Sequence, residues 1–179
     1  HAKSMVGWSD LPADLSDMAH LARLDAALPQ DAVVVSSDLK RAVDTADAIT
    51  GPRPRLPHDP DLREIHFGDW ELKRFDEVED QDHIRAYWDN PGDIRPPGGE
   101  SFDELCSRVA PALHALAARA QEGPLAVVCH AGVVRAALGL ALEAPARGLA
   151  FEVAPLSLTR LRCYDGGFSI IAANWRPAA

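Results

Sequence analysis

The sequence predicts an α/β fold, a three-layer α/β/α sandwich built around a mainly parallel sheet. Two short runs rich in β-branched residues, 31–38 and 124–130, are typical of parallel strands that are buried on both faces. Each run is followed directly by a segment with the apolar spacing of a helix. Alternation of strand and helix favours an open α/β sheet, and 179 residues suit a single domain, 1–179.

The two strand–helix pairs have the same layout. The first strand is DAVVVSSD (31–38), and the helix after it has its apolar residues at Leu39, Ala42, Val43, Ala46 and Ile49. The second strand is PLAVVCH (124–130), and its helix is GVVRAALGLAL (132–142). We expect both strands to end at one edge of the sheet, because parallel strands run in the same direction. Ligands of open α/β folds bind beyond the carboxyl ends of the strands.

A longer helix is predicted between these pairs, starting after Ser101. Ser101 and Glu104 have the spacing of a capping box. An apolar stripe follows at Phe102, Leu105, Val109, Leu113 and Leu116. Pro111 lies inside the stripe, where a proline costs about 3 kcal/mol because it removes a backbone donor and clashes with the preceding turn. We therefore expect a kink or a restart of the helix at Pro111.

The remaining chain divides into an irregular middle and a C-terminal hairpin. Residues 51–100 are rich in Pro, Asp and Trp, and we expect them to form a lid-like insertion within the single domain. Residues 158–175 read as two strands around a turn at residues 165–167.

Charge and cysteine content limit the partners and the compartment. The formal net charge of −9 argues against nucleic acid or an anionic membrane, since both bind a basic surface. The three cysteines are far apart and odd in number, which favours neither a disulfide framework nor a Cys-x-x-Cys metal site. No signal peptide is recognisable, and no apolar run approaches the roughly 18–20 residues of a membrane helix. We expect a cytoplasmic protein, and the sequence leaves its oligomeric state open.

Polar side chains stand where both predicted strands end. The first strand leads into Arg41 on the first turn of its helix, and the second strand ends in His130. A cation and an imidazole beside helix N-termini, where backbone N–H groups point outward, form a cradle for an anion. Phosphate is the anion that we expect. No GxxxxGK[ST] motif is present, nor a GxGxxG after a strand, so a nucleotide-binding loop is not indicated.

Four blocks, each several residues long, then follow one another along the chain. They are SSDLKRAVDTADAI (36–49), LREIHFGDWE (62–71), PPGGESFDEL (96–105) and VVCHAGVVRA (127–136). In this order and at this spacing they resemble the histidine phosphatase superfamily, which has the phosphoglycerate-mutase-like fold. The resemblance implies an enzyme that transfers a phosphoryl group by way of a histidine.

The start of the chain extends this resemblance. The residues HAKS (1–4) are similar to the back of the family's Arg-His-Gly or Arg-His-Ala signature, in which the histidine is the nucleophile. The resemblance thus implies that His1 is the catalytic histidine. It also implies an N-terminal strand and an arginine before His1, neither of which the sequence contains. The alternative is that His1 and Ala2 are the remnant of an expression tag.

The resemblance also assigns roles to the other candidate residues. Arg41 and His130 would bind the phosphate, and Ser4 stands where the family often has a threonine that can do the same. Glu64 corresponds to the general acid, so the implied catalytic set is His1, Glu64 and His130. An arginine fork and imidazole groups can hold the phosphoryl oxygens in place of a metal ion, so we expect neither metal nor other cofactor.

Three other carboxylates near Glu64 compete for the role of proton donor. They are Asp69, Glu71 and Glu100. Glu71 and Glu100 could instead cap a helix or anchor a loop. We favour Glu64, because apolar neighbours such as Ile65 and Phe67 would raise its pKa by desolvation, as a proton donor at neutral pH requires.

The sequence favours one function and leaves several open. The favoured function is a metal-independent phosphomonoesterase that acts on a small phosphorylated substrate through a phosphohistidine, because the long insertions that we associate with the mutases are missing. The pattern is similar to the α-ribazole phosphatase branch, which implies α-ribazole 5′-phosphate as one candidate substrate. The alternatives are a phosphoglycerate mutase, a phosphohistidine protein phosphatase and a catalytically silent phosphate-binding module.

Overall fold

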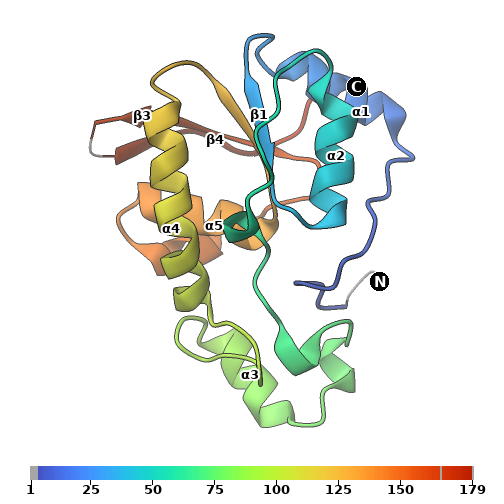
Figure 1. Cartoon of the computed structure of the whole chain (residues 1–179). Helices are drawn as coiled ribbons and strands as arrows, with labels where there is room; N and C mark the ends of the chain where they lie inside the picture. Colours follow the sequence, from blue (N-terminus) through green and yellow to red (C-terminus); the bar gives the residue numbers. More distant parts are fainter. Residues whose placement is uncertain (1–3, 166, 179) are drawn as a thin grey trace.

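The computed structural model describes residues 4–165 and 167–178 (Figure 1). Its helices are α1 (Met18–Ala27), α2 (Lys40–Thr50), α3 (Gln81–Asp89), α4 (Phe102–Arg119) and α5 (Ala131–Ala141). Its strands are β1 (Val33–Ser36), β2 (Leu125–Val128), β3 (Leu158–Tyr164) and β4 (Gly167–Trp175). Short 3₁₀ helices occur at η1 (Pro60–Leu62), η2 (Gly68–Trp70), η3 (Phe75–Glu77) and η4 (Pro145–Ala150). None of the helices in these ranges is long and apolar enough to cross a membrane.

A parallel pair of strands forms the centre of the molecule. β1 and β2 pair in register from Val33 with Leu125 to Ser36 with Val128, so their carboxyl ends lie side by side. α2 and α4 lie on either side of this pair (Figure 1). Residues 54–56 run along the other edge of β1, where Val34 donates to the Pro54 carbonyl at 2.8 Å. The predicted α/β class is therefore confirmed.

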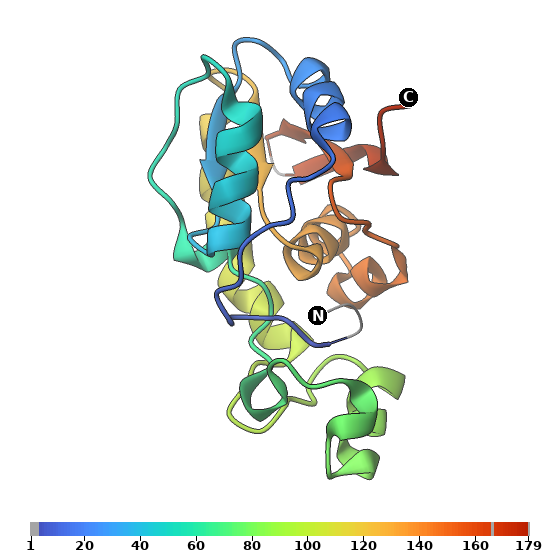
Figure 2. The same ribbon diagram turned by 90° about the vertical axis from the view of Figure 1, so that its right-hand side faces the viewer.

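The C-terminal strands depart from the predicted sheet. β3 and β4 pair antiparallel, from Tyr164 with Gly167 outward, and form a sheet separate from β1 and β2. Strands joined by so tight a turn can only run antiparallel, whereas parallel strands require a long crossover. Within the described ranges, a parallel pair and an antiparallel pair thus replace the single mainly parallel sheet that we predicted. The hairpin lies beside α1 and α5 (Figure 2).

Helix α4 begins as predicted but continues through its proline. Ser101 accepts a hydrogen bond from the Glu104 amide and Glu104 caps the Ser101 amide in return, so the predicted capping box is confirmed. No restart occurs at Pro111, because α4 is one helix from Phe102 to Arg119. Pro111 is exposed, while Leu105 and Val109 on the opposite face are fully buried. Burial of this face outweighs the backbone hydrogen bond lost at the proline.

Residues from about Glu64 to Glu100 form a lobe that hangs from the carboxyl-end edge of the central strands (Figures 1 and 2). Helix α3, which the sequence analysis did not predict, lies within this lobe and is capped by Asp80. The lobe and the rest of the molecule share one apolar core, whose buried members include Ile65, Phe67, Trp70, Ile84, Tyr87, Phe102, Leu105 and Val133. The lobe therefore packs firmly on α4 and α5, and its service as a lid stays a prediction.

Candidate active site

The two central strands deliver Arg41 and His130 to the same edge of the fold. After β1, Leu39 caps α2 and Arg41 lies on the first turn of that helix. After β2, His130 itself is the N-cap residue of α5, with extended backbone. The Ser37 amide donates to the Val128 carbonyl at 3.0 Å, which ties the two strand ends together. The arrangement follows from parallel pairing, because both strands leave the sheet in one direction.

His130 carries a buried nitrogen that is left without a partner. The residue is 8% exposed, and its Nε2 has no hydrogen-bond partner within residues 4–165 and 167–178. Burial, with the positive charges of Arg41 and Arg108, lowers the pKa of His130 to about 3. The ring is therefore neutral at physiological pH. A buried polar atom of this kind costs free energy until a ligand bonds it, so Nε2 marks a binding position.

The half-buried guanidinium of Arg41 binds the loop of residues 7–9 and keeps further N–H donors that this loop does not use. Its Nη2 donates to the Gly7 carbonyl at 2.6 Å and its Nη1 to the Ser9 carbonyl at 3.1 Å. Burial lowers its pKa, and the negative charges of Glu64 and Glu71 oppose that effect. A guanidinium has five N–H donors, so three remain for an anion beside the two that the loop uses. In the described chain no carboxylate forms an ion pair with Arg41.

Glu64 places its carboxylate on the N-terminus of α5, next to His130. The carboxylate accepts from the Gly132 amide at 3.0 and 3.2 Å and from the Ile65 amide at 2.9 Å. A Cβ atom on Gly132 would lie 2.1 Å from Glu64 Oε1, so the carboxylate can occupy this place only beside a glycine. Desolvation raises the pKa of Glu64, although these amide bonds and the Arg41 charge oppose it. A carboxyl group with a raised pKa can donate a proton nearer to neutral pH.

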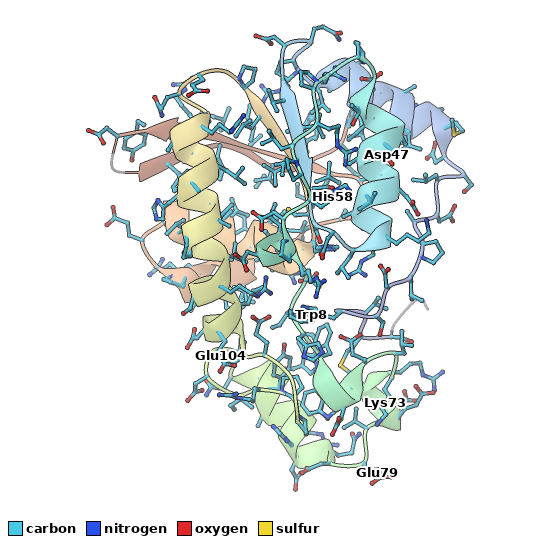
Figure 3. All side chains as sticks on the ribbon, viewed as in Figure 1. Trp8, Asp47, His58, Lys73, Glu79 and Glu104 are labelled. Atoms are coloured by element: carbon cyan, nitrogen blue, oxygen red, sulfur yellow. The ribbon has the colours of Figure 1, made fainter. Side chains whose placement is uncertain are left out.

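The backbone of Glu64 is fixed from outside as well. Its carbonyl accepts from the Trp8 indole Nε1 at 2.8 Å and from Arg108 Nη2 at 3.3 Å. Trp8 lies where the body of the molecule meets the lobe (Figure 3). Its ring packs against His66, with centroids 4.6 Å apart, and against the Arg63 guanidinium at 4.8 Å. These contacts leave Glu64 little freedom to move.

The three competing carboxylates have other partners or lie in solvent. Glu71 accepts hydrogen bonds from the loop of residues 7–9 and from Phe67. Glu100 forms two parallel bonds with Arg108, each 2.8 Å long. Asp69 is exposed. Of the four carboxylates, Glu64 is the one that lies beside His130.

Of the two N-terminal candidates, the structure describes only Ser4. His1 lies outside the described residues. Ser4 forms an isolated bridge with Arg74, and the following residue, Met5, donates to the Lys73 carbonyl at 2.9 Å. The structure thus brings Arg41, Glu64 and His130 together and pairs Ser4 with the backbone of the lobe.

Two arginines of the site were missed by the sequence analysis. Arg63 binds Asp38 through Nε and Nη2 at 2.7 and 2.6 Å, and Arg108 binds Glu100. The side chains of Arg63 and Arg108 are therefore each paired with a carboxylate. The adjacency of Arg63 to Glu64 is the one sequence signal that points to it, and Arg108 has none.

The described residues contain no cluster of side chains suited to binding a metal ion. Within residues 4–165 and 167–178, no three His, Cys, Asp or Glu side chains form a group that could hold a metal ion. The groups near His130 include the Arg41 guanidinium, whose charge lowers the His130 pKa, and the amides at the start of α5, which His130 precedes as N-cap residue. Donors of this kind bind an anion.

Comparisons with known proteins identify the family. A model of the histidine phosphatase superfamily (branch 1) matches residues 1–176. The chain is 32% identical over 176 residues to a bifunctional protein of Mycobacterium tuberculosis, covering 94% of this chain but 46% of that protein. It is 34% identical over 149 residues to the glucosyl-3-phosphoglycerate phosphatase of Mycolicibacterium vanbaalenii, covering 75% of this chain and 66% of that one.

A solved structure is similar over the whole length. The α-ribazole phosphatase of Shigella flexneri superposes with a TM-score of 0.85 at 21% identity, over 99% of this chain and 91% of that chain. At this identity the likeness concerns the fold. The chain spans about half the length of the mycobacterial bifunctional protein.

Proposed function

The chain belongs to the histidine phosphatase superfamily, and we propose that it is a metal-independent phosphomonoesterase that acts through a phosphohistidine at His1. The observation that carries the proposal is the convergence of three groups at one strand-end edge. Arg41 offers free donors, His130 an unpartnered buried nitrogen, and Glu64 a carboxyl group with a raised pKa. Together they can serve as an anion clamp and a proton donor, and Arg41 is close enough to Glu64 for its charge to lower the pKa of that carboxyl group.

The reaction that we propose has two steps. A neutral ring nitrogen of His1 attacks phosphorus in line, forming a P–N bond while the ester P–O bond breaks. Protonated Glu64 gives its proton to the departing alkoxide. The Glu64 carboxylate then takes a proton from water, which attacks the phosphohistidine and releases inorganic phosphate. The assignment of His1 rests on family membership, since His1 lies outside the described residues.

Arg41 and His130 would hold the phosphoryl oxygens during both steps. The guanidinium supplies fixed donors for the equatorial oxygens, and the imidazole supplies a ring nitrogen from the opposite strand end. Positive charge in this role stabilises the transition state as a metal ion does in other phosphatases. Ser4 is proposed as an additional donor to the phosphate.

Hydrolysis is favoured over mutase activity by the ion pairs at the rim. A mutase must hold a second anionic group of its substrate, which requires further unpaired cations. Arg63 and Arg108 lie at this rim, and each is neutralised by its own carboxylate. Their pairing supports a site for a single phosphoryl group. The phosphatase name of the Mycolicibacterium relative points the same way.

A substrate panel with and without chelator tests the proposal. It comprises an activated aryl phosphate, α-ribazole 5′-phosphate, glucosyl-3-phosphoglycerate and 3-phosphoglycerate. We expect hydrolysis of the aryl phosphate and of at least one small phosphorylated metabolite, with the rate unchanged by EDTA. Loss of activity in EDTA with recovery on adding a divalent cation would overturn the metal-independent mechanism. Isomerisation of 3-phosphoglycerate without hydrolysis would favour the mutase.

A further inference from the structure

The loop of residues 7–9 is held by a single carboxylate, that of Glu71. Glu71 Oε2 accepts from the Gly7 amide at 3.1 Å and from the Ser9 amide and hydroxyl at 3.2 and 2.7 Å. Its Oε1 accepts from the Trp8 amide at 2.7 Å and from the Phe67 amide at 3.1 Å. Five donors therefore meet on one ionised side chain. Bonds to a charged acceptor are stronger than bonds between neutral groups.

The same loop contacts Arg41, the proposed phosphate-binding residue, and Glu64, the proposed proton donor. Its carbonyls at Gly7 and Ser9 accept from the Arg41 guanidinium. Its indole at Trp8 donates to the Glu64 carbonyl. The amides of the loop thus bond to Glu71 and its carbonyls bond to Arg41. The indole of Trp8 connects the loop to the backbone of Glu64.

The loop packs closely against its surroundings at Gly7. A Cβ atom on Gly7 would lie 2.2 Å from the Ile65 carbonyl oxygen and 2.4 Å from Glu71 Oε1. Directly after Glu71, Leu72 adopts a left-handed backbone with φ of 64°, and its amide donates to the Met5 carbonyl at 2.8 Å. A non-glycine residue in this conformation is strained and persists where its surroundings fix it.

We propose that Glu71 is a positioning residue, which holds Arg41 and Glu64 in their working places through the loop of residues 7–9. The inference rests on the proposed phosphatase function, and it gives Glu71 a task distinct from proton donation. Burial raises the pKa of Glu71, but the bonds from Ser9, Trp8, Phe67 and Gly7 outweigh that effect and lower it. Glu71 therefore stays ionised, as an anchor for amides requires.

Glu71→Gln removes the charge while keeping the shape, and its kinetic signature should be specific. Displacement of the loop loosens Arg41, which serves every substrate, and also Glu64, which matters most for poor leaving groups. We expect kcat/KM to fall on the order of 10²-fold on an alkyl phosphate and clearly less on an activated aryl phosphate. KM should rise for both substrates, because Arg41 is displaced. Glu79→Gln is the control, since Glu79 is an exposed carboxylate of the same lobe, far from Trp8 (Figure 3).

A double-mutant cycle with Trp8→Phe tests the route to Glu64. Trp8→Phe removes the indole donor to the Glu64 carbonyl and keeps an aromatic ring in place. If Glu71 acts on Glu64 through Trp8, the additional loss of Glu71→Gln on the alkyl substrate should disappear in the Trp8→Phe background. Full additivity of the two losses on the alkyl phosphate would contradict the proposal.

Amide hydrogen exchange separates failure of this proposal from failure of the proposed function. Exchange at residues 7–9 should accelerate at least tenfold in Glu71→Gln, with no change in Glu79→Gln, whatever reaction the protein catalyses. Unchanged exchange at these amides would overturn the anchoring role. Accelerated exchange with unchanged kinetics on both substrates would overturn the link to Arg41 and Glu64. Absence of phosphatase activity in the unmodified protein would instead overturn the proposed function and leave the exchange result standing.

Discussion

At the scale of single residues, Glu64 shows how one carboxyl group is suited to proton transfer. Desolvation favours its neutral form, while the amides of Ile65 and Gly132 and the charge of Arg41 favour its ionised form. The net effect raises the pKa, so both forms are accessible nearer to neutral pH than for an ordinary glutamate. A residue that must first donate and then accept a proton requires this balance.

Glu64→Gln should separate substrates by their leaving groups. The amide leaves the anion clamp in place but cannot donate a proton, so we expect a loss of about 10²–10⁴-fold on an alkyl phosphate. The loss on an activated aryl phosphate should be much smaller, because that leaving group departs without protonation. Steady-state kinetics on the two substrates measure the contrast. Equal losses on both would mean that Glu64 acts in positioning or in hydrolysis of the phosphohistidine.

The same substitution should change the pH dependence of stability. The folded-state pKa of Glu64 is raised above its ordinary 4.5, so its contribution to stability is complete below pH 4.5 and is lost as pH rises through the folded value. Glu64→Gln cannot ionise. Its urea midpoint relative to that of the unmodified protein should therefore rise from pH 4.5 upward, with exposed Glu79→Gln as the reference. A difference independent of pH would show that the Glu64 pKa is not raised on folding.

Sequence reasoning predicted Arg41, Glu64 and His130 as site residues but not the contacts that fix them in the structure. Two of the three follow strand ends directly, and parallel pairing then places them at one edge. The supporting contacts join distant residues: Trp8 to Glu64 across 56 positions and Trp8 to Glu71 across 63. Contacts at such separations leave no periodicity in the sequence. The sequence allowed loop anchoring as an alternative role for Glu71, but it could not predict the five hydrogen bonds that the Glu71 carboxylate accepts.

At the scale of elements, the N-terminus of α5 combines three functions. Its N-cap residue is His130, and it receives the Glu64 carboxylate on the Gly132 amide. We propose that the other amides of its first turn contribute to binding the anion. A helix N-terminus stabilises a carboxylate by its dipole as well as by its N–H groups. The absence of a side chain at Gly132 makes this approach possible.

Gly132→Ala should displace Glu64 without unfolding the helix. The new Cβ would meet Glu64 Oε1 at 2.1 Å and Leu105 Cδ2 at 3.0 Å, so the carboxylate must move. Alanine itself favours a helix over glycine by about 1 kcal/mol, which offsets part of the strain. We expect circular dichroism to stay native-like and kcat/KM on an alkyl phosphate to fall on the order of 10²-fold. An unchanged rate on the alkyl substrate would contradict the proposal that the Glu64 carboxylate must lie on the Gly132 amide to act.

The elements themselves were predictable to different degrees. The strands 31–38 and 124–130 and their helices follow from local pattern: β1 and β2 lie within the predicted ranges, and α2 and α5 match the predicted helices to within one residue at each end. Of the predicted kink or restart at Pro111, the restart does not occur, because burial of one face of α4 outweighs the cost at an exposed proline, and the kink stays a prediction. Helix α3 was missed, because it lies in a stretch whose prolines and aspartates dominate the local signal.

At the scale of the whole molecule, the proposed anion site lies in a protein of formal net charge −9. The long-range field therefore repels a phosphorylated substrate, and local positive charge must overcome it. We propose that the Arg41 charge and the N-terminus of α5 supply this positive potential, while the neutral His130 ring adds a hydrogen-bonding nitrogen. The shared apolar core fixes the lobe on α4 and α5, so the site is formed between two firmly packed parts.

The central claim is that turnover passes through a phosphohistidine at His1, and trapping that intermediate tests it most directly. Glu64→Gln with an activated aryl phosphate is the system of choice, because phosphorylation requires no proton donor while hydrolysis of the intermediate lacks its base. After an alkaline quench and peptide mapping, we expect an acid-labile, base-stable phosphate on His1 that is absent from His1→Ala. Steady hydrolysis with no covalent phosphate, or with phosphate on another side chain, would contradict the account.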